Sequence, residues 1–487
     1  MEMNQNYCDE IVSLPLTGLA AALRERKLSA AEVTEAYLDN IRRKEETVHA
    51  YITVAEDLAR ENAAAADQRL REGTGGALCG IPCAVKDNIA VKGYPTTCGS
   101  RMLQNFVPPY SAAVCEKLWR EGAVVLGKTN MDEFAMGSSC EKSVFGPTRN
   151  PLDLTRSPGG SSGGSAASVA AGEAAFALGT DTGGSARQPA AFCGLVSMKP
   201  TYGLVSRYGM VELASSLEQI CPITRTAADN ALVLSSICGY DKKDMTSLDD
   251  TYDKDYLTES ADIAGLRVGV FAGFDSFCDE TVSKGVYRTA EKLRRLGVSV
   301  DEAVLPSPDL ALDIYVITMA AEASSNLARY DGIKYGYSAD DVTASRSAGF
   351  GEEVRRRIIT GTYALSSVYK GDYYRKIKLA EQELCGKVDE LFHIYDILLM
   401  PTTGSVAFPL GSFDDAPTGL YSSDRFTVYA NLTGCPAITI PCGGDGVLPC
   451  GVTLMGPRMS EKLLYGAAAV LEAELCEDVR NEVKRDV

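Results

Sequence analysis

The feature that most constrains this chain is a stretch dense in glycine and serine, residues 158–194, which reads PGGSSGGSAASVAAGEAAFALGTDTGGSARQPAAFCG. It contains two serine-bearing glycine turns, GGSSGG and DTGGS, and each turn leads into small residues that can form a helix. Because glycine permits tight backbone turns, such segments can aim several N–H groups at one point. The serines in these turns are therefore candidate nucleophiles that stand beside N–H donors.

A serine hydroxyl is a weak nucleophile and needs a positioned base. The chain of 487 residues contains only two histidines. His49 falls in a helical surface segment and His393 at a helix end, and neither has a motif around it, so both are interpreted as structural. The base is therefore expected to be a residue of another type.

A lysine can act as the base where burial lowers its pKa until the amine is neutral. Lys86 meets this requirement, since it ends the apolar run IPCAV and precedes Asp87 and Asn88. Lys128 and Lys199 also follow apolar stretches. Residue types and positions alone leave all three lysines open.

The composition is that of an ordinary globular protein, with 45% hydrophobic and 23% charged residues. No apolar run approaches the roughly 20 residues of a membrane-spanning helix, and the first residues lack the pattern of a signal peptide. We therefore expect a cytoplasmic protein without a membrane partner. The net charge of −17 predicts a surface that repels nucleic acid, except where a basic patch is local.

The 15 cysteines are scattered along the chain, and none has the paired CxxC spacing of a zinc site. No histidine accompanies the two loose clusters that they form. We therefore expect reduced, mostly buried thiols and neither disulfides nor a metal site.

The order of patterns along the chain predicts an α/β fold. The first 75 residues look helical, and Ser29 with Glu32 forms a capping-box pattern. From there on, short apolar runs alternate with glycines and helical stretches, which is typical of a large mixed β-sheet covered by helices on both faces. Strands are expected at residues 81–85, 123–126, 174–178, 266–271, 395–401, 437–441 and 451–456.

We expect two regions that make effectively one large domain. Residues 1–75 form an N-terminal helical region packed on the core, and residues 76–487 form the α/β part. A helical insertion is expected near residues 270–395, and a helix around residues 459–474 closes the chain.

Residues 122–129, GAVVLGKT, match the pattern of a phosphate-binding loop. Such a loop presents backbone N–H groups after a strand and before a helix. Here the intervening residues are Ala-Val-Val-Leu, which favour a buried strand, and the residues before them look helical. We therefore interpret the segment as a strand followed by a turn rather than as a nucleotide site.

The segments GGSSGGSAASVAAG and GTDTGGSARQPAAFCG resemble the signature of the amidase family. In that family a lysine, a serine in a cis peptide and a second, nucleophilic serine form a catalytic triad. The resemblance implies that Ser185 is the nucleophile, Ser161 the proton relay and Lys86 the base, on an amidase-signature fold. The spacings agree with this, because 75 residues separate Lys86 from Ser161 and 24 separate Ser161 from Ser185.

The turn that precedes Ser185 is expected to form an oxyanion hole. It aims the N–H groups of Thr182, Gly183 and Gly184, with that of Ser185 itself, at one region. Such donors stabilise a tetrahedral oxyanion, and the loss of one donor typically costs about 3–4 kcal/mol. The alternative is that both glycine turns merely connect strands to helices.

Within the amidase family, the chain looks most like the glutaminase (A) subunits of tRNA-dependent amidotransferases. The resemblance rests on residues 129–139, 145–165, 199–209, 214–231, 322–337 and 351–367 and on the overall length. It implies a heterotrimer in which this chain hydrolyses glutamine and passes ammonia to the B subunit, with the C subunit as third partner. On the B subunit, misacylated Glu-tRNA(Gln) becomes Gln-tRNA(Gln) with ATP and Mg, so no cofactor is expected in this chain.

A glutaminase needs a cation for the substrate carboxylate and an anion for its ammonium group. By resemblance, Arg357 and Asp424 are the candidates for these roles, and Tyr315 is a third substrate-binding residue. Arg357 also fits a solvated basic helix face at residues 355–357, and Asp424 also fits a loop or capping residue.

Two other functions remain open from the sequence. One is a stand-alone amidase that hydrolyses a small carboxamide, and the other is a non-catalytic interaction protein within a complex. Whether Glu-tRNA(Gln), Asp-tRNA(Asn) or both are served is also left open.

Overall fold

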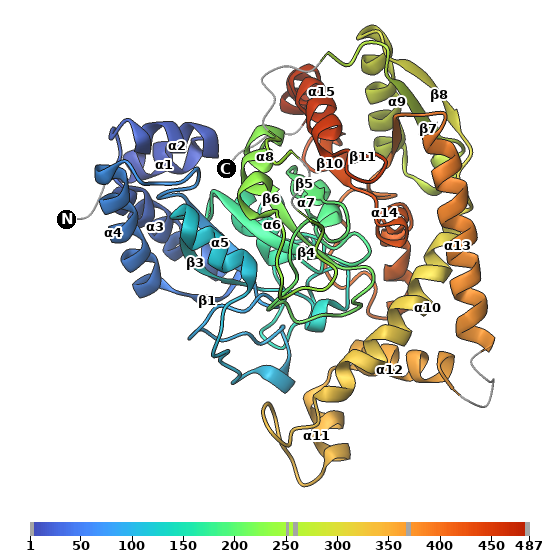
Figure 1. Ribbon diagram of the computed structural model, residues 1–487, viewed down its shortest axis with the longest axis horizontal. Coiled ribbons are helices and arrows are strands. Elements are labelled where there is room, and N and C mark those ends of the chain that lie inside the picture. Colours follow the sequence, from blue (N-terminus) through green and yellow to red (C-terminus); the bar gives the residue numbers. More distant parts are fainter. Residues whose placement is uncertain (1–3, 250–252, 257–261, 367–371, 483–487) are drawn as a thin grey trace.

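The computed structural model describes the chain except residues 1–3, 250–252, 257–261, 367–371 and 483–487 (Figure 1). Of residues 372 and 476–482 only the backbone is described. The helices are α1 (Gln5–Ser13), α2 (Leu16–Arg24), α3 (Ala30–Val48), α4 (Glu56–Glu72), α5 (Ala113–Glu121), α6 (Gly163–Ala170), α7 (Arg187–Phe192), α8 (Ala227–Ile237), α9 (Glu280–Arg295), α10 (Pro308–Asn326), α11 (Val342–Gly349), α12 (Glu352–Ala364), α13 (Asp372–Phe392), α14 (Val428–Thr433) and α15 (Glu461–Glu482).

The described residues form one sheet of eleven strands, in the order β1-β3-β2-β4-β6-β5-β10-β11-β9-β7-β8. The sheet is mixed, since β2 runs parallel to both β3 and β4, whereas β6, β5, β10 and β11 pair antiparallel with their neighbours. The strands are β1 (Tyr51–Val54), β2 (Pro82–Lys86), β3 (Val124–Thr129), β4 (Phe176–Asp181), β5 (Val196–Lys199), β6 (Gln219–Thr224), β7 (Arg267–Phe271), β8 (Ser299–Ala303), β9 (Ile397–Pro401), β10 (Ala437–Gly444) and β11 (Pro449–Met455).

The central strands are covered on both faces. Every residue of β2, β3, β4, β6 and β11 is buried. Because successive side chains of a strand point to opposite faces, full burial requires packing on both sides. The predicted α/β class with a large mixed sheet is therefore confirmed.

The N-terminal helices α1 to α4 lie at one end of the molecule, and α10 to α13 lie at the other (Figure 1). The predicted capping box is present, with Ser29 and Glu32 each bonding the backbone of the other at the start of α3. His49 ends this helix in a left-handed conformation. Residues 1–75 are not wholly helical, because they include the strand β1, which pairs with β3 at the edge of the sheet.

The expected helical insertion near residues 270–395 contains α9 to α13 but also a strand, β8. This is a correction. β8 is exposed or half-buried at four of its five positions, because it lies at the edge of the sheet and pairs only with β7. An edge strand of this kind lacks the apolar pattern that marks a central strand.

The segment that matches a phosphate-binding loop contains a strand, β3, as expected, but residues 127–129, which were expected to form a turn, continue that strand. Gly122 ends α5 with a φ of +87°, and residues 124–129 are buried within the sheet. Lys128 pairs with Asp87, with 2.9 Å between Nζ and Oδ1. The glycine thus serves as a helix C-cap rather than a phosphate cradle.

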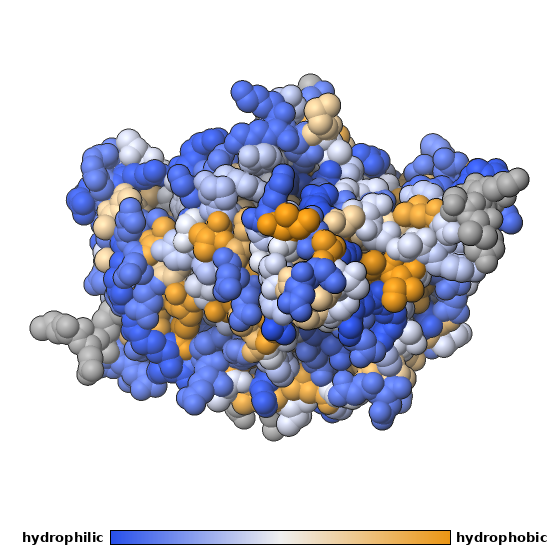
Figure 2. Space-filling view, turned by 90° about the horizontal axis from the view of Figure 1, so that it is seen from below, coloured by the Kyte–Doolittle hydropathy of each residue, from blue (hydrophilic) through white to orange (hydrophobic). Residues whose placement is uncertain are grey.

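Within the described residues, no helix is long and apolar enough to cross a membrane. The face seen in Figure 2 is largely hydrophilic, with hydrophobic residues in small scattered groups. The fourteen described cysteines are free thiols, and twelve of them are buried. No group of three or more metal-binding side chains occurs in this part of the chain.

Candidate active site

The site forms where two neighbouring strands end. Because β2 and β4 are parallel neighbours, their carboxyl ends meet at the same edge of the sheet. Lys86 is the last residue of β2, and the turn that carries Ser185 begins after Asp181, the last residue of β4. The other turn, with Ser161, leads into α6, which packs on β2 and β4. A direct hydrogen bond joins the two turns, from Ser162 N–H to the Ser185 carbonyl (2.9 Å).

Lys86 lies at the centre of a group of hydroxyls. Its Nζ is 2.8 Å from Ser161 Oγ, 2.8 Å from Ser162 Oγ and 2.9 Å from Thr180 Oγ1. Lys86 is fully buried, and this burial lowers its pKa, while the nearby carboxyl of Glu218 offsets part of the effect. A buried amine with a lowered pKa can accept a proton, which is the property that a base requires.

The structure distinguishes the three candidate lysines. Lys86 contacts the first glycine turn through Ser161 and Ser162. Lys128 is bound by Asp87, and Lys199 Nζ donates to the carbonyl of Pro200 (2.7 Å). His49 contacts the carbonyl of Pro147 (3.1 Å). Of these residues, Lys86 alone bonds a serine of either glycine turn.

The Ser185 turn is held by a buried ion pair. Asp181 receives Nε and Nη2 of Arg187, each at 3.0 Å, and neither side chain is exposed to solvent. Asn431 donates to Asp181 Oδ1 (3.0 Å) and receives a hydrogen bond from Arg187 Nη2 (2.7 Å). Burial would raise the pKa of Asp181, but Arg187 lowers it to about 2. Asp181 is thus ionised at neutral pH, and it accepts hydrogen bonds from the N–H groups of Gly184, Ala186 and Arg187 on either side of Ser185.

The free N–H donors of the turn differ from the expectation. Gly184 N–H donates to Asp181 Oδ1 (2.9 Å), so this group is not available to an oxyanion. Within the described residues, the backbone N–H groups of Thr182, Gly183 and Ser185 have no acceptor. The structure therefore corrects the set of expected donors by removing Gly184. Gly184 has a φ of +129°, and a Cβ there would collide with the side chain of Thr427, so the position requires glycine.

Two of the three predicted substrate-binding residues lie at this turn. A Cβ on Gly183 would collide with the ring of Tyr315, and Thr427 Oγ1 donates to the Gly183 carbonyl at 2.5 Å. Thr427 Oγ1 also lies 3.0 Å from the carbonyl of Asp424. The structure thus brings Tyr315 and Asp424 to the turn that carries Ser185.

Asp424 is buried and accepts from Ser138 Oγ at 3.0 and 3.1 Å. Burial raises its pKa to about 7, and the Ser138 hydroxyl and Arg357 offset part of this effect. Arg357 is buried as well and belongs to α12. The burial of Arg357 does not fit the alternative of a solvated helix face.

Gln188 joins Ser138, which binds Asp424, to the turn that carries Ser161. Its Nε2 donates to the Ser138 carbonyl (2.8 Å), and its Oε1 accepts from Gly160 N–H (2.8 Å). The peptide bond between Gly160 and Ser161 is cis. One fully buried amide therefore connects the residue that binds Asp424 to the residue before Ser161.

Sequence reasoning missed several residues of the site. They lie at strand ends, in helices α7 and α14 or in loops next to the two turns, and they are Ser138, Ser162, Thr180, Asp181, Arg187, Gln188, Glu218, Thr427 and Asn431. Asp181, Arg187 and Gln188 stand inside the glycine-rich stretch itself. Charged and amide side chains amid small residues are the sequence signal that indicates these three residues.

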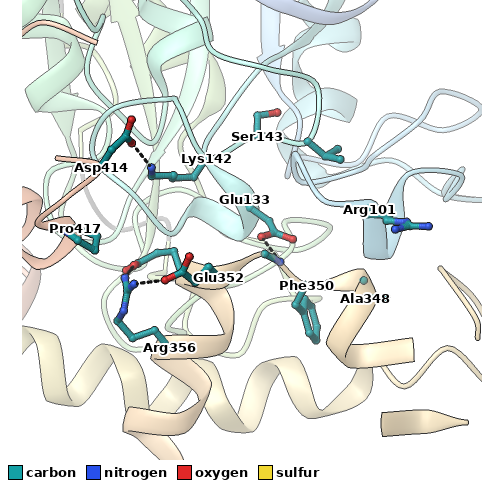
Figure 3. Close-up of a pocket in the computed structure, with 14 residues that line it drawn as sticks. Arg101, Glu133, Lys142, Ser143, Ala348, Phe350, Glu352, Arg356, Asp414 and Pro417 are labelled. Carbon is teal, nitrogen blue, oxygen red and sulfur yellow. Dashed lines mark hydrogen bonds and ion pairs between the residues drawn. The ribbon is translucent and has the colours of Figure 1, made fainter. Parts of the chain in front are cut away.

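A charged pocket lies beside Arg357. Its volume is about 460 Å³, and Figure 3 shows that its walls come from α11 and α12 on one side and from loops on the other. Glu353, the ion-pair partner of Arg357, lines it. The other polar and charged lining residues are Arg101, Glu133, Lys142, Ser143, Glu352, Arg356 and Asp414.

A serine beside free N–H donors, a second serine and a buried lysine together define a hydrolase site that does not use histidine. The arrangement is suited to acyl transfer from an amide or ester. The family model described as Amidase matches residues 32–465, and the chain belongs to the amidase family.

Relatives and solved structures agree over most of the chain. The A subunit of a glutamyl-tRNA(Gln) amidotransferase from Thermoanaerobacter pseudethanolicus is 48% identical over 476 residues, which is 95% of this chain and 96% of that protein. The crystal structure of the corresponding glutamyl-tRNA(Gln) amidotransferase protein from Thermotoga maritima is 38% identical, with a TM-score of 0.77 over 97% of this chain and 96% of that one. The native peptide amidase of Stenotrophomonas maltophilia is 30% identical, with a TM-score of 0.82 over 96% and 98% of the two chains.

Proposed function

We propose that this chain is the glutamine-hydrolysing subunit of a tRNA-dependent amidotransferase. One observation carries the proposal: Tyr315 and the buried carboxyl of Asp424 lie at the turn that bears Ser185, and the buried Arg357 is near enough for its charge to lower the pKa of that carboxyl. Opposite charges at a nucleophile are what a free amino acid requires, since its carboxylate and ammonium must both be matched. The likeness to several glutamyl-tRNA(Gln) amidotransferase A subunits over nearly the whole chain supports the same function.

The first half of the reaction forms an acyl-enzyme. Ser185 Oγ attacks the side-chain amide carbon of glutamine, and its proton moves through Ser161 Oγ to Lys86 Nζ. The carbonyl oxygen becomes an oxyanion, which accepts hydrogen bonds from the N–H groups of Thr182, Gly183 and Ser185. Because these donors lack a protein acceptor in the described residues, they need no rearrangement as the charge develops.

The second half releases the two products. The proton on Lys86 returns through Ser161 to the amide nitrogen, the C–N bond breaks and ammonia leaves. A water molecule then attacks the ester on Ser185 and gives up a proton along the same path to Lys86. That proton returns through Ser161 to Ser185 Oγ as the ester C–O bond breaks, and glutamate departs. Lys86 thus serves in turn as base and as the source of the returning proton.

Recognition of the substrate divides between two charged residues. Arg357 binds the α-carboxylate, and Asp424, held by Ser138, binds the α-ammonium group. Tyr315 lies against Gly183 and shapes the space between them. The burial of all three residues strengthens each charge interaction relative to the same contact in water.

The ammonia would serve a second active site on another protein of the complex. We propose a cytoplasmic heterotrimer with the B and C subunits, in which Glu-tRNA(Gln) is converted to Gln-tRNA(Gln). ATP and Mg²⁺ would act on the B subunit, so that this chain requires no cofactor. The acidic surface of the chain (net charge −17) supports tRNA binding by a partner rather than by this chain.

The proposal is tested with Ser185→Ala in the assembled complex. We expect glutamine-dependent formation of Gln-tRNA(Gln) to vanish, while transamidation with added ammonium chloride continues at the wild-type rate. A wild-type chain that hydrolyses small carboxamides at full rate without partners, and does not act on glutamine, would instead indicate a stand-alone amidase. Loss of both activities in a folded Ser185→Ala complex would contradict the assignment.

A further inference from the structure

Glu353 lies between the charged pocket and the arginine assigned to the substrate. It stands one helical turn before Arg357 on α12, and its Oε1 accepts from Arg357 Nε at 2.7 Å. The same oxygen accepts from the hydroxyl of Tyr421 at 2.6 Å. Its Oε2 forms an ion pair with Arg356. We call Glu353, Arg357 and Tyr421 the carboxylate clamp.

The clamp fixes the guanidinium of Arg357 in three ways. Nε is held by Glu353, Nη1 donates to Met319 Sδ at 3.4 Å, and the guanidinium carbon lies 5.0 Å from the centre of the Tyr421 ring. In the described residues Nη2 has no hydrogen-bond partner. The plane of the Arg357 guanidinium is therefore oriented before a ligand binds, and Nη2 remains available to donate to that ligand.

The carboxyl of Glu353 is ionised in this environment. Burial would raise its pKa, but Arg357, the Tyr421 hydroxyl and Arg356 lower it below the ordinary value. Its side chain is 11% exposed, so it is screened from solvent far more than a surface carboxylate. A screened anion in direct contact with a buried arginine controls the orientation of that arginine more strongly than an exposed pair does.

We propose that Glu353 is a positioning residue that presents Arg357 to the α-carboxylate of the substrate, and so selects amides that carry such a group. This inference rests on the proposed function, because it assumes that the substrate is a free amino acid. Glu353 does not contact the reacting atoms. Its loss should therefore weaken binding of the carboxylate without slowing chemistry at Ser185.

The neighbouring residue provides a matched control. Glu352 also pairs with Arg356, with 2.9 Å between the charged atoms, but its side chain is 81% exposed and it does not contact Arg357. Figure 3 shows Glu352 and Arg356 side by side at the pocket wall. Glu352→Gln thus removes a carboxylate from the same helix and pocket without disturbing the clamp.

The experiment compares Glu353→Gln, Glu353→Ala and Glu352→Gln with the wild-type chain in its complex. Three amides serve as substrates: glutamine, 5-amino-5-oxopentanoate, which is glutamine without its α-amino group, and butyramide, which has neither charge. We expect Glu353→Gln to raise KM for the two carboxylates about tenfold, and Glu353→Ala to raise it further. The kcat for both, the kcat/KM for butyramide and all constants of Glu352→Gln should stay within about twofold of wild type.

The outcomes that would contradict the proposal can be distinguished from one another. An unchanged KM for glutamine in Glu353→Ala overturns the positioning role, and so does an equal loss of kcat/KM toward butyramide, which would indicate general damage to the fold. Thermal unfolding of each variant identifies such damage directly. A wild-type enzyme that accepts butyramide but neither carboxylate would overturn the proposed function itself.

Discussion

Asp181 and Arg187 form a bidentate ion pair, shielded from solvent, that closes the turn bearing Ser185. The same carboxylate accepts the N–H of Gly184. Asp181 therefore anchors the turn and also binds one of its backbone N–H donors, that of Gly184. The charge pair therefore holds together the two ends of the turn that bears Ser185.

Arg187→Met should destabilise the protein, because it leaves a buried carboxylate without a counter-charge. The removal of one partner from a buried ion pair typically costs about 3–5 kcal/mol of unfolding free energy. Urea denaturation at pH 7 measures this loss. The double variant Asp181→Asn with Arg187→Met should recover part of it, since the unpaired charge is then gone. A loss below about 1 kcal/mol for Arg187→Met would mean that the turn does not depend on the pair.

The rate of glutamine hydrolysis should rise with pH as Lys86, whose pKa is lowered, loses its proton. The amine must be neutral to accept the serine proton, and burial shifts this transition below the ordinary value of 10.5. Glu218 is fully buried and acts in the opposite direction, because its negative charge favours the ammonium form. Glu218→Gln should therefore move the acidic limb of the kcat/KM profile to lower pH. A shift to higher pH would contradict this electrostatic role.

The sequence predicted the location of the candidate site better than the residues that support it. The two serine turns and Lys86 could be proposed as the site because their residue types, motifs and spacing are local properties of the chain. The choice among Lys86, Lys128 and Lys199 could not be made from residue types, since it depends on which strands are neighbours in the sheet. The pairing of β2 with β4 makes that choice.

The remaining differences have similar causes. The hydrogen bond from the Gly184 N–H to Asp181 depends on the side-chain rotamer of Asp181 in the folded turn. No pattern in DTGGS predicts that rotamer. Arg357 and Asp424 come from separate segments, α12 and the 3₁₀ turn Pro417–Asp424. Only the resemblance to a family could suggest that they meet. The strand β8 was missed because an edge strand does not need the apolar pattern of a central one.

Ser162→Ala should lower kcat moderately, and less than Ser161→Ala. Ser162 Oγ lies 2.8 Å from Lys86 Nζ and donates to the Thr180 carbonyl (3.1 Å), so it helps to orient the amine. Loss of one orienting contact should reduce kcat about tenfold, whereas loss of a proton relay typically costs about 10²- to 10⁴-fold. Steady-state kinetics on both variants, with circular dichroism to verify folding, measures the difference. Equal losses would place both hydroxyls on the proton path.

The affinity for glutamine should fall as the solution becomes acidic, because Asp424 must be ionised to bind the ammonium group. Burial raises the pKa of this carboxyl to about 7, so its neutral form predominates below that pH. KM for glutamine should therefore rise about tenfold per pH unit below 7. For 5-amino-5-oxopentanoate, which has no ammonium group, KM should not depend on pH in this range. Asp424→Asn should raise KM for glutamine and remove its pH dependence, while it leaves KM for the analogue within about twofold of wild type. A parallel rise of KM for both substrates at low pH would assign the titration to a group other than Asp424.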